Sequence, residues 1–348
     1  MLNKKESYLC LSAVVRAREP KLLDSARITR MLEASSYAEC ARMLTDSGYE
    51  DMSSMDTAGV CAALNRHREE TIHGIETLSP DPEVTGVFRI PYDYHNAKAI
   101  IKSEAVGTAT PLMIASGRVQ PDRLVQRYAA EEYRDMPGHL GVAMREAKST
   151  LARTSNPQLA DFVLDRACYA DITDLAEESG NDFLKGYAAL LVDSANYRTV
   201  VRTIRLGKIT DVLHDALIPG GKLSAEDILR TAGTFLSGQS TSGTAAAASH
   251  ANPDAITALF TSAGLENAAA SAKAALEGGR LTSFELDCDN IVTAYLRSAK
   301  YVSYGPEPVI AYLAGVENEI TTVRMILAGR LSGTDTQLLK ERLRDTYV

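Results

Sequence analysis

Apolar residues recur along most of the chain at spacings of three, four or seven residues. A clear example runs from Ile28 to Leu44, where apolar side chains keep this spacing. Such a stripe is typical of an amphipathic helix. The sequence contains no run of alternating β-branched residues bounded by an Asn-Gly or Asp-Gly turn, the pattern that would indicate a hairpin. The pattern predicts an all-α fold.

Signals for the ends of helices punctuate this pattern. Asp81-Pro82 is typical of an N-cap followed by proline at the first helical position. A capping box places Ser or Thr three residues before an acid, so that two exposed backbone amides at the helix start are satisfied. Glycine after a periodic stretch predicts a helix end. The predicted starts of this kind are Ser36 with Glu39, Thr282 with Glu285 and Ser224 with Asp227, and the predicted ends are Gly48, Gly107, Gly207 and Gly329.

Residues 231–279 are rich in Ala, Ser, Thr and Gly. A flexible linker is one interpretation of this composition. Apolar residues from Ala255 to Leu265 nevertheless keep helical spacing. We therefore expect closely packed helices of small residues, with a looser segment around Ser237–Ser249.

Three segments of the chain align without gaps. They read NAKAIIKSEAVG (residues 96–107), NYRTVVRTIRLG (196–207) and NEITTVRMILAG (318–329). Each has Asn, a cation six residues later and Gly five residues beyond that. Asp93 and Asp193 stand three residues before Asn in the first two copies, where the third has Gly315. The cations are Lys102, Arg202 and Arg324.

This repeat predicts three equivalent helices that end at glycine. A cation in the last helical turn would face the negative end of the helix dipole, and the glycine would adopt the left-handed conformation that closes a helix. These residues are therefore expected to hold helices in place and not to bind a ligand. A threefold helical repeat favours three similar bundles and a scaffold role over an enzyme with one pocket.

The composition is that of a soluble globular protein. Of 348 residues, 45% are hydrophobic and 24% are charged, and 37 basic against 45 acidic side chains give a net charge of -8. This charge argues against nucleic acid as a partner. The five cysteines contain no CxxC pair, which disfavours a zinc ribbon. No window approaches 18 apolar residues, so we expect a cytoplasmic protein that meets a membrane only through other proteins.

Candidate chemistry is sparse. The sequence has no GxxxxGK[ST] phosphate loop, GxGxxG motif or GxSxG elbow. Glu70 and His73, with His67 nearby, have the spacing of one half of a di-iron site, but the second half is missing. The acids from Asp171 to Asp182 form the one candidate for magnesium-pyrophosphate binding, and a solvated helix face explains them better. We predict no catalytic residue, no cofactor site and no metal site.

Several segments together resemble one known family. YLCLSAVVRAREPKLLDSARITRMLEASSYAECARMLTDSGYED (8–51), FRIPYDYHNAKAIIKSE (88–104), ANYRTVVRTIRLGK (195–208) and EPVIAYLAGVENEITTVRMILAGRLSG (307–333) are similar, in order, to the family of C subunits of V-type ATP synthases. That family is related to the vacuolar ATPase d subunit. The similarity covers nearly the whole chain and is weakest over 231–279.

The resemblance implies a rotor subunit without catalysis. It would be a funnel-shaped array of three helical bundles, 1–107, 108–208 and 209–348, between central-stalk subunits of the D and F type and the membrane proteolipid ring. It would couple ATP chemistry to proton or sodium transport, and exposed cations such as Arg205, Lys208 and Arg330 would pair with acidic loops of partners. The alternative is a freestanding helical scaffold or adaptor that binds protein partners.

Overall fold

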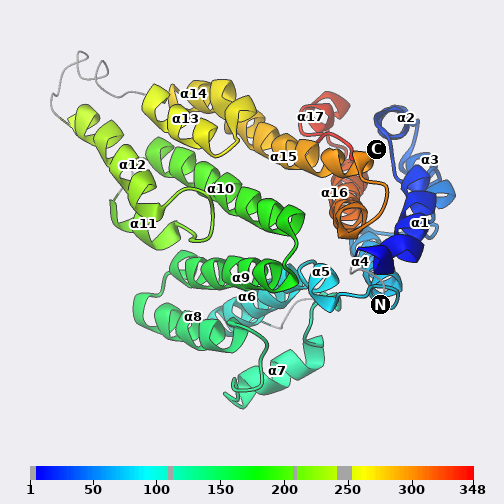
Figure 1. Cartoon of the computed structure of the whole chain (residues 1–348), viewed down its shortest axis with the longest axis horizontal. Coiled ribbons are helices and arrows are strands. Elements are labelled where there is room, and N and C mark those ends of the chain that lie inside the picture. Colours follow the sequence, from blue (N-terminus) through cyan, green and yellow to red (C-terminus); the bar gives the residue numbers. More distant parts are fainter. Residues whose placement is uncertain (1–4, 109–112, 207–209, 241–252) are drawn as a thin grey trace. The chain divides into compact units, whose positions relative to one another are not determined.

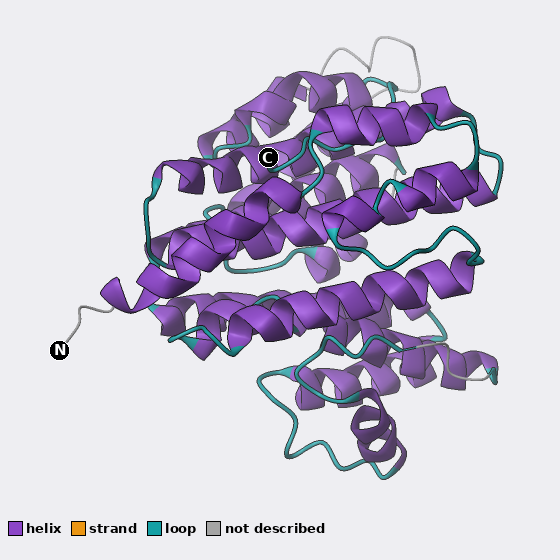
Figure 2. Cartoon of the chain, turned by 90° about the vertical axis from the view of Figure 1, so that its right-hand side faces the viewer, coloured by secondary structure: helices purple, strands orange, loops and turns teal. Residues whose placement is uncertain are grey.

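The computed structural model describes residues 5–108, 113–206, 210–240 and 253–348. Within these ranges the regular elements are helices, and no strand is present (Figure 2). The prediction of an all-α fold is confirmed. The α-helices, labelled in Figure 1, are α1 (Leu9–Arg18), α2 (Ser25–Glu33), α3 (Tyr37–Arg42), α4 (Thr57–Glu76), α5 (Pro82–Gly86), α6 (Ile90–Val106), α7 (Pro121–Ala129), α8 (Leu140–Thr154), α9 (Pro157–Ser179), α10 (Asp182–Arg205), α11 (Thr210–Ala216), α12 (Ala225–Ser240), α13 (Pro253–Ser262), α14 (Ala269–Leu276), α15 (Leu281–Arg297), α16 (Pro306–Leu331) and α17 (Thr336–Lys340).

The chain divides into two compact units. Unit 1 consists of residues 1–88 and 292–348, and unit 2 consists of residues 89–291. Unit 1 is therefore built from both ends of the sequence, whereas unit 2 is continuous. The division into bundles at residues 107 and 208 stays a prediction.

In unit 1, α16 is the central helix. It packs against α4, α1 and α3 (Figure 1). Its buried positions run from Pro308 to Gly329 and occupy every side of the helix. A helix that is apolar all round is stable only when neighbours enclose it, and here α4 and the N-terminal helices do so.

In unit 2, α9 is the central helix. It packs against α8, α6 and α10 (Figure 1). The next long helix, α10, also contacts α12 and α14. The core of this unit includes the stacked rings of Tyr197 and Phe260, whose centroids are 4.1 Å apart, with the Phe284 ring edge-on to Tyr197.

Most of the predicted helix starts are confirmed. The Ser36 hydroxyl accepts a hydrogen bond from the Glu39 amide at 3.2 Å, and the Ser224 hydroxyl accepts one from the Asp227 amide at 3.1 Å. Asp81 is the N-cap residue of α5, which begins at Pro82. The predicted start at Thr282 is wrong, because α15 begins at Leu281 directly after the turn that closes α14.

Two broader expectations also have a clear outcome. The stripe from Ile28 to Leu44 is divided between α2 and α3, with the break just before the Ser36 cap. Most of the described part of 231–279 is helical, within α12, α13 and α14. Residues 241–249 of the predicted looser segment lie outside the described residues, and 237–240 are helical.

The glycine stops differ from one another. Gly48 and Gly107 follow helical segments with φ of +93° and +70°, as predicted, and Gly207 lies outside the described residues. Gly329 is a correction: α16 continues through it to Leu331. Its role is close packing, since a Cβ at Gly329 would approach a terminal carbon of Leu339 in α17 to 2.6 Å.

Alanine at the two glycines should therefore destabilise for different reasons. We expect Gly107→Ala to cost about 1–2 kcal/mol through the left-handed backbone alone, because nothing lies within 4 Å of its Cβ position. We expect Gly329→Ala to cost about 1–3 kcal/mol through overpacking. In a Leu339→Ala background, urea unfolding should show the Gly329→Ala cost relieved and the Gly107→Ala cost unchanged. Equal costs of Gly329→Ala in both backgrounds would contradict the packing role.

Candidate functional site

The repeated asparagines tie non-helical segments to the long helices. Asn96 in α6 donates through Nδ2 to the Ile114 carbonyl at 2.8 Å and accepts through Oδ1 from the Ile114 amide at 2.9 Å. Asn196 in α10 makes the same two bonds with Ile218, at 2.8 Å and 2.9 Å. Both asparagines are buried. Each side-chain amide thus satisfies the donor and the acceptor of one residue that has no helical partner.

One turn earlier, the repeated aspartates hold the same segments. Asp93 accepts from the Val119 amide at 2.9 Å and from Nε of Arg118 at 2.8 Å. Asp193 accepts from the Lys222 amide at 2.9 Å and the Leu223 amide at 3.3 Å. Both carboxylates are fully buried, and burial raises the pKa of each despite these hydrogen bonds.

The held segments share a signature that the helical repeat does not include. Residues 114–119 read Ile-Ala-Ser-Gly-Arg-Val, and 218–223 read Ile-Pro-Gly-Gly-Lys-Leu. Both match Ile-x-x-Gly, then a cation, then an aliphatic residue. A Cβ at Gly117 or Gly221 would collide with the aspartate carboxylate, so glycine is required for the backbone to approach. Because this match lies outside the long helices, a search limited to helical spacing does not find it.

The cations of the first two copies form ion-pair ladders with a second helix. Lys98 and Lys102 of α6 pair with Asp165 and Asp161 of α9 at 2.6 Å and 2.7 Å. In the same arrangement, α10 is joined to α15 by the pairs Arg198–Asp289 and Arg202–Glu285. Of the three repeated cations, Arg202 alone lies in the last turn of its helix as expected. Lys102 and Arg202 instead form ion pairs with acids of a neighbouring helix.

The third copy keeps the asparagine and changes its surroundings. Asn318 in α16 donates to the Asp345 carbonyl at 2.9 Å, which again ties a downstream segment to the long helix. Gly315 replaces the aspartate, and the Tyr347 side chain lies 3.0 Å from the position that a Cβ on residue 315 would occupy. Arg324 lies in the interior of α16, so the prediction for the third cation is wrong.

Glu319, the residue after this asparagine, is a buried carboxylate in unit 1. It accepts hydrogen bonds from the Leu23 amide and from the Tyr49 hydroxyl, the latter at 2.7 Å. Desolvation raises the pKa of Glu319 to about 7, and these two donors oppose the shift only in part. Tyr49 also stacks on His67, with ring centroids 3.9 Å apart.

Comparison with known proteins bears directly on this architecture. Residues 11–342 match the model of the ATP synthase (C/AC39) subunit family. The chain belongs to that family. The resemblance carried by the four sequence segments is thereby confirmed over nearly the whole chain.

Individual relatives of the family are distant in sequence. The C subunit of the V-type sodium ATPase of Enterococcus hirae is 21% identical over 345 residues, which cover 98% of this chain and 99% of that protein. The C subunit of the A-type ATP synthase of Methanocaldococcus jannaschii is 24% identical over 56% of this chain and 54% of that protein. The C subunit of the V-type ATP synthase of Thermus thermophilus is 23% identical over 62% and 68%.

The structure separates the residues considered for metal binding. His67 is half-buried against Tyr49, and burial lowers its pKa, whereas Glu70 and His73 of the same helix are exposed. Within the described ranges, no group of three or more His, Cys, Asp or Glu side chains is placed to hold a metal ion. No described helix of this family member is long and apolar enough to cross a membrane.

The acidic run that begins at Asp171 is not one solvated face, which corrects the sequence interpretation. Asp171 is buried and accepts hydrogen bonds from Tyr94 at 3.0 Å and from the His139 amide at 2.7 Å. Arg118 bridges it to Asp93. The exposed Asp174 carboxylate lies 2.9 Å from His139.

Two of the cations expected to meet partners are occupied within the chain. Arg330 donates to the carbonyls that end α2, including that of Ala34 at 2.6 Å. Arg205 donates to the carbonyls of Ala275 and Gly279, the former at 2.7 Å. Both therefore act on the carbonyl ends of neighbouring helices. Lys208 lies outside the described residues.

We call the paired hydrogen bonds of Asn96 with Ile114, and of Asn196 with Ile218, asparagine clamps. Removal of one clamp should lower the free energy of unfolding far more than removal of an exposed asparagine side chain does. We expect Asn196→Ala to reduce the free energy of unfolding by about 2–4 kcal/mol, because the Ile218 amide and carbonyl lose buried partners. Urea unfolding measures the change. Asn267→Ala, at an exposed amide in the same unit, is the control and should change stability by less than about 0.5 kcal/mol. A cost for Asn196→Ala as small as the control would refute the clamp.

Glu319 should make the protein less stable as the pH rises. The folded protein keeps the Glu319 proton up to about pH 7, whereas the unfolded chain loses it near pH 4.3, so the folded state binds more protons between these values. The stabilisation is full below about pH 4 and is lost as pH rises through 7, by about 4 kcal/mol in total. Glu319→Gln should remove this decline.

Urea unfolding at pH 5 and pH 8 tests the dependence. The difference in stability between wild type and Glu319→Gln should change by about 2–3 kcal/mol between the two pH values. The exposed Glu266→Gln variant should differ from wild type equally at both. A pH dependence that Glu319→Gln leaves unchanged would contradict this assignment.

Proposed function

We propose that the chain is a non-catalytic rotor subunit of a V-type ATP synthase or ATPase. In this role it joins D-type and F-type subunits of the central stalk to the membrane proteolipid ring and passes torque between them during proton or sodium transport. The observation that carries the proposal is the end-to-end correspondence with the C subunit of a V-type sodium ATPase, over 98% of this chain and 99% of that protein. Membership of the ATP synthase (C/AC39) subunit family supports it.

The clamps and ladders suit a part that carries torque. A coupling element must resist shear between its helices, because any slip loses rotation. In α6 and α10 the non-helical neighbours are fixed by two buried side chains a turn apart, and neighbouring helices are fixed by two ion pairs. This gives several independent points of attachment along each long helix. The proposal also includes an arrangement of three such bundles in a funnel, which lies at the cytoplasmic side of the membrane without entering it. It further includes kinship with the vacuolar ATPase d subunit.

Removal of the chain should uncouple the motor without stopping ATP chemistry. We expect the tagged chain to co-purify with stalk and ring subunits. In membranes that lack it, ATP-driven ion uptake should fall by about tenfold or more, while the released head still hydrolyses ATP. Uptake into vesicles and phosphate release measure the two activities. The isolated chain should hydrolyse no ATP.

As a control, the Asn267→Ala chain is added back to the membranes that lack the chain, and it should restore ion uptake. Recovery of the chain free of stalk and ring subunits would favour a freestanding helical scaffold. Ion uptake that is unchanged without the chain would refute the coupling role.

A further inference from the structure

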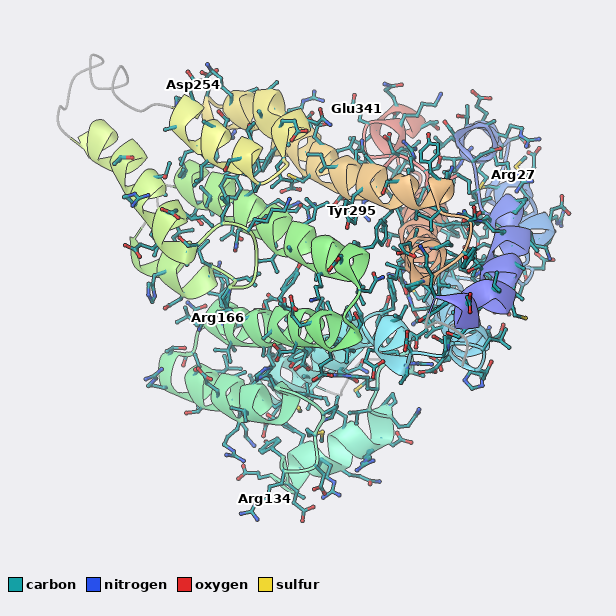
Figure 3. All side chains as sticks on the ribbon, in the orientation of Figure 1. Arg27, Arg134, Arg166, Asp254, Tyr295 and Glu341 are labelled. Atoms are coloured by element: carbon teal, nitrogen blue, oxygen red, sulfur yellow. The ribbon has the colours of Figure 1, made fainter. Side chains whose placement is uncertain are left out.

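Unit 2 also has a groove that is lined by residues of α8, α9, α11 and α12. Two adjoining clefts meet at Arg166 of α9 and Pro219, and both residues line both clefts. The larger, of about 700 Å³, lies among α9, α11 and α12. The smaller, of about 260 Å³, lies between α8 and α9. Figure 3 shows Arg166 on α9 beside α11.

Much of the lining of this groove is apolar, and several of its residues are small. Val142 of α8, which is 66% exposed, lines the smaller cleft, and Leu229 of α12 lines the larger. Between them, Ala143 of α8 and Ala167 and Ala170 of α9 line the smaller cleft. Alanine allows a helix to approach another closely, because the distance between helix axes depends on the side chains at the contact. The groove can therefore take a helix at close range.

Its charges are arranged as acid, base, acid. Among the residues that the structure describes, none forms an ion pair or hydrogen bond with the side chain of Arg166, Glu146 or Glu226. Glu146 belongs to the smaller cleft, Glu226 to the larger, and Arg166 to both. The other ionisable groups of the groove have partners within the chain, in the pairs His139–Asp174, His214–Asp215 and Arg230–Asp227.

We propose that this groove binds an amphipathic helix of another subunit of the complex. The helix presents an apolar stripe to Val142 and Leu229, a carboxylate near its middle to Arg166, and basic residues toward its ends to Glu146 and Glu226. The charge order of the groove specifies this order in the partner. This inference rests on the proposed function, since it places the partner in the same assembly.

Crosslinking in the assembled complex tests the proposal. A photoreactive amino acid is placed at Val142 or Leu229 of the tagged chain, and at Val125 of α7 as a position outside the groove. Both groove positions should crosslink to one segment of one subunit, identified by mass spectrometry, with an acid between apolar residues at helical spacing. Val125 should not reach that segment.

Charge reversal then tests the role of Arg166. Arg166→Glu should reduce the yield of the groove crosslinks at least tenfold, and Arg166→Lys should retain most of the yield. Arg153→Glu, an exposed cation of α8 outside the groove, should leave it unchanged. Thermal unfolding of each variant reports whether the chain is folded, and Arg166→Gln provides a milder loss of charge if Arg166→Glu is unstable.

The outcomes separate this inference from the function on which it rests. If the chain joins the complex but the groove positions link to nothing, to lipid, or to a segment without a carboxylate, the inference is wrong and the proposed function stands. Crosslinks insensitive to Arg166→Glu also overturn it. If the chain does not enter the complex, both are wrong.

Discussion

A backbone amide or carbonyl that leaves water must find another partner, and this requirement organises the long helices of the protein. A helix uses its own backbone groups internally, so only its side chains can hold a non-helical segment. Asn96 and Asn196 each do so by pairing with both polar groups of one isoleucine. The aspartate one turn away adds a second attachment. Together they position the segment from which α7 or α12 begins.

Much of the helical architecture can be predicted from apolar spacing and capping residues, because both are local. The sequence also shows the spacing of Asn, cation and glycine, but it does not show which residues these side chains contact. Lys102 meets Asp161, and Arg202 meets Glu285, at sequence separations of 59 and 83 residues. Local pattern cannot assign such partners. The Ile-x-x-Gly segments were accessible to sequence comparison, since the same pattern follows each aspartate, although Gly117 lies 24 residues after Asp93 and Gly221 lies 28 residues after Asp193.

The third copy departs from the other two where unit 1 is assembled from distant parts of the chain. A tyrosine ring covers Gly315, and Glu319 receives hydrogen bonds from residues near the N-terminus. Sequence could not have identified Glu319 as special, because the groups that donate hydrogen bonds to it, on Leu23 and Tyr49, lie 296 and 270 residues away in the chain. The groove on unit 2 is a similar case. Arg166 is ordinary in sequence, and its lack of a partner among the described residues is visible only in three dimensions.

The discontinuity of unit 1 bears on the order in which the protein is made. Its first 88 residues leave the ribosome before α16, the helix around which they pack. About 200 residues separate them, which at about 5–20 residues per second is a delay of about 10–40 s. Unit 2 is one continuous segment of the chain, so its helices do not wait for a distant segment to be synthesised. During synthesis, the apolar faces of α1, α3 and α4 therefore stay without their final cover until α16 has been made, and in this interval they are open to aggregation and chaperone binding.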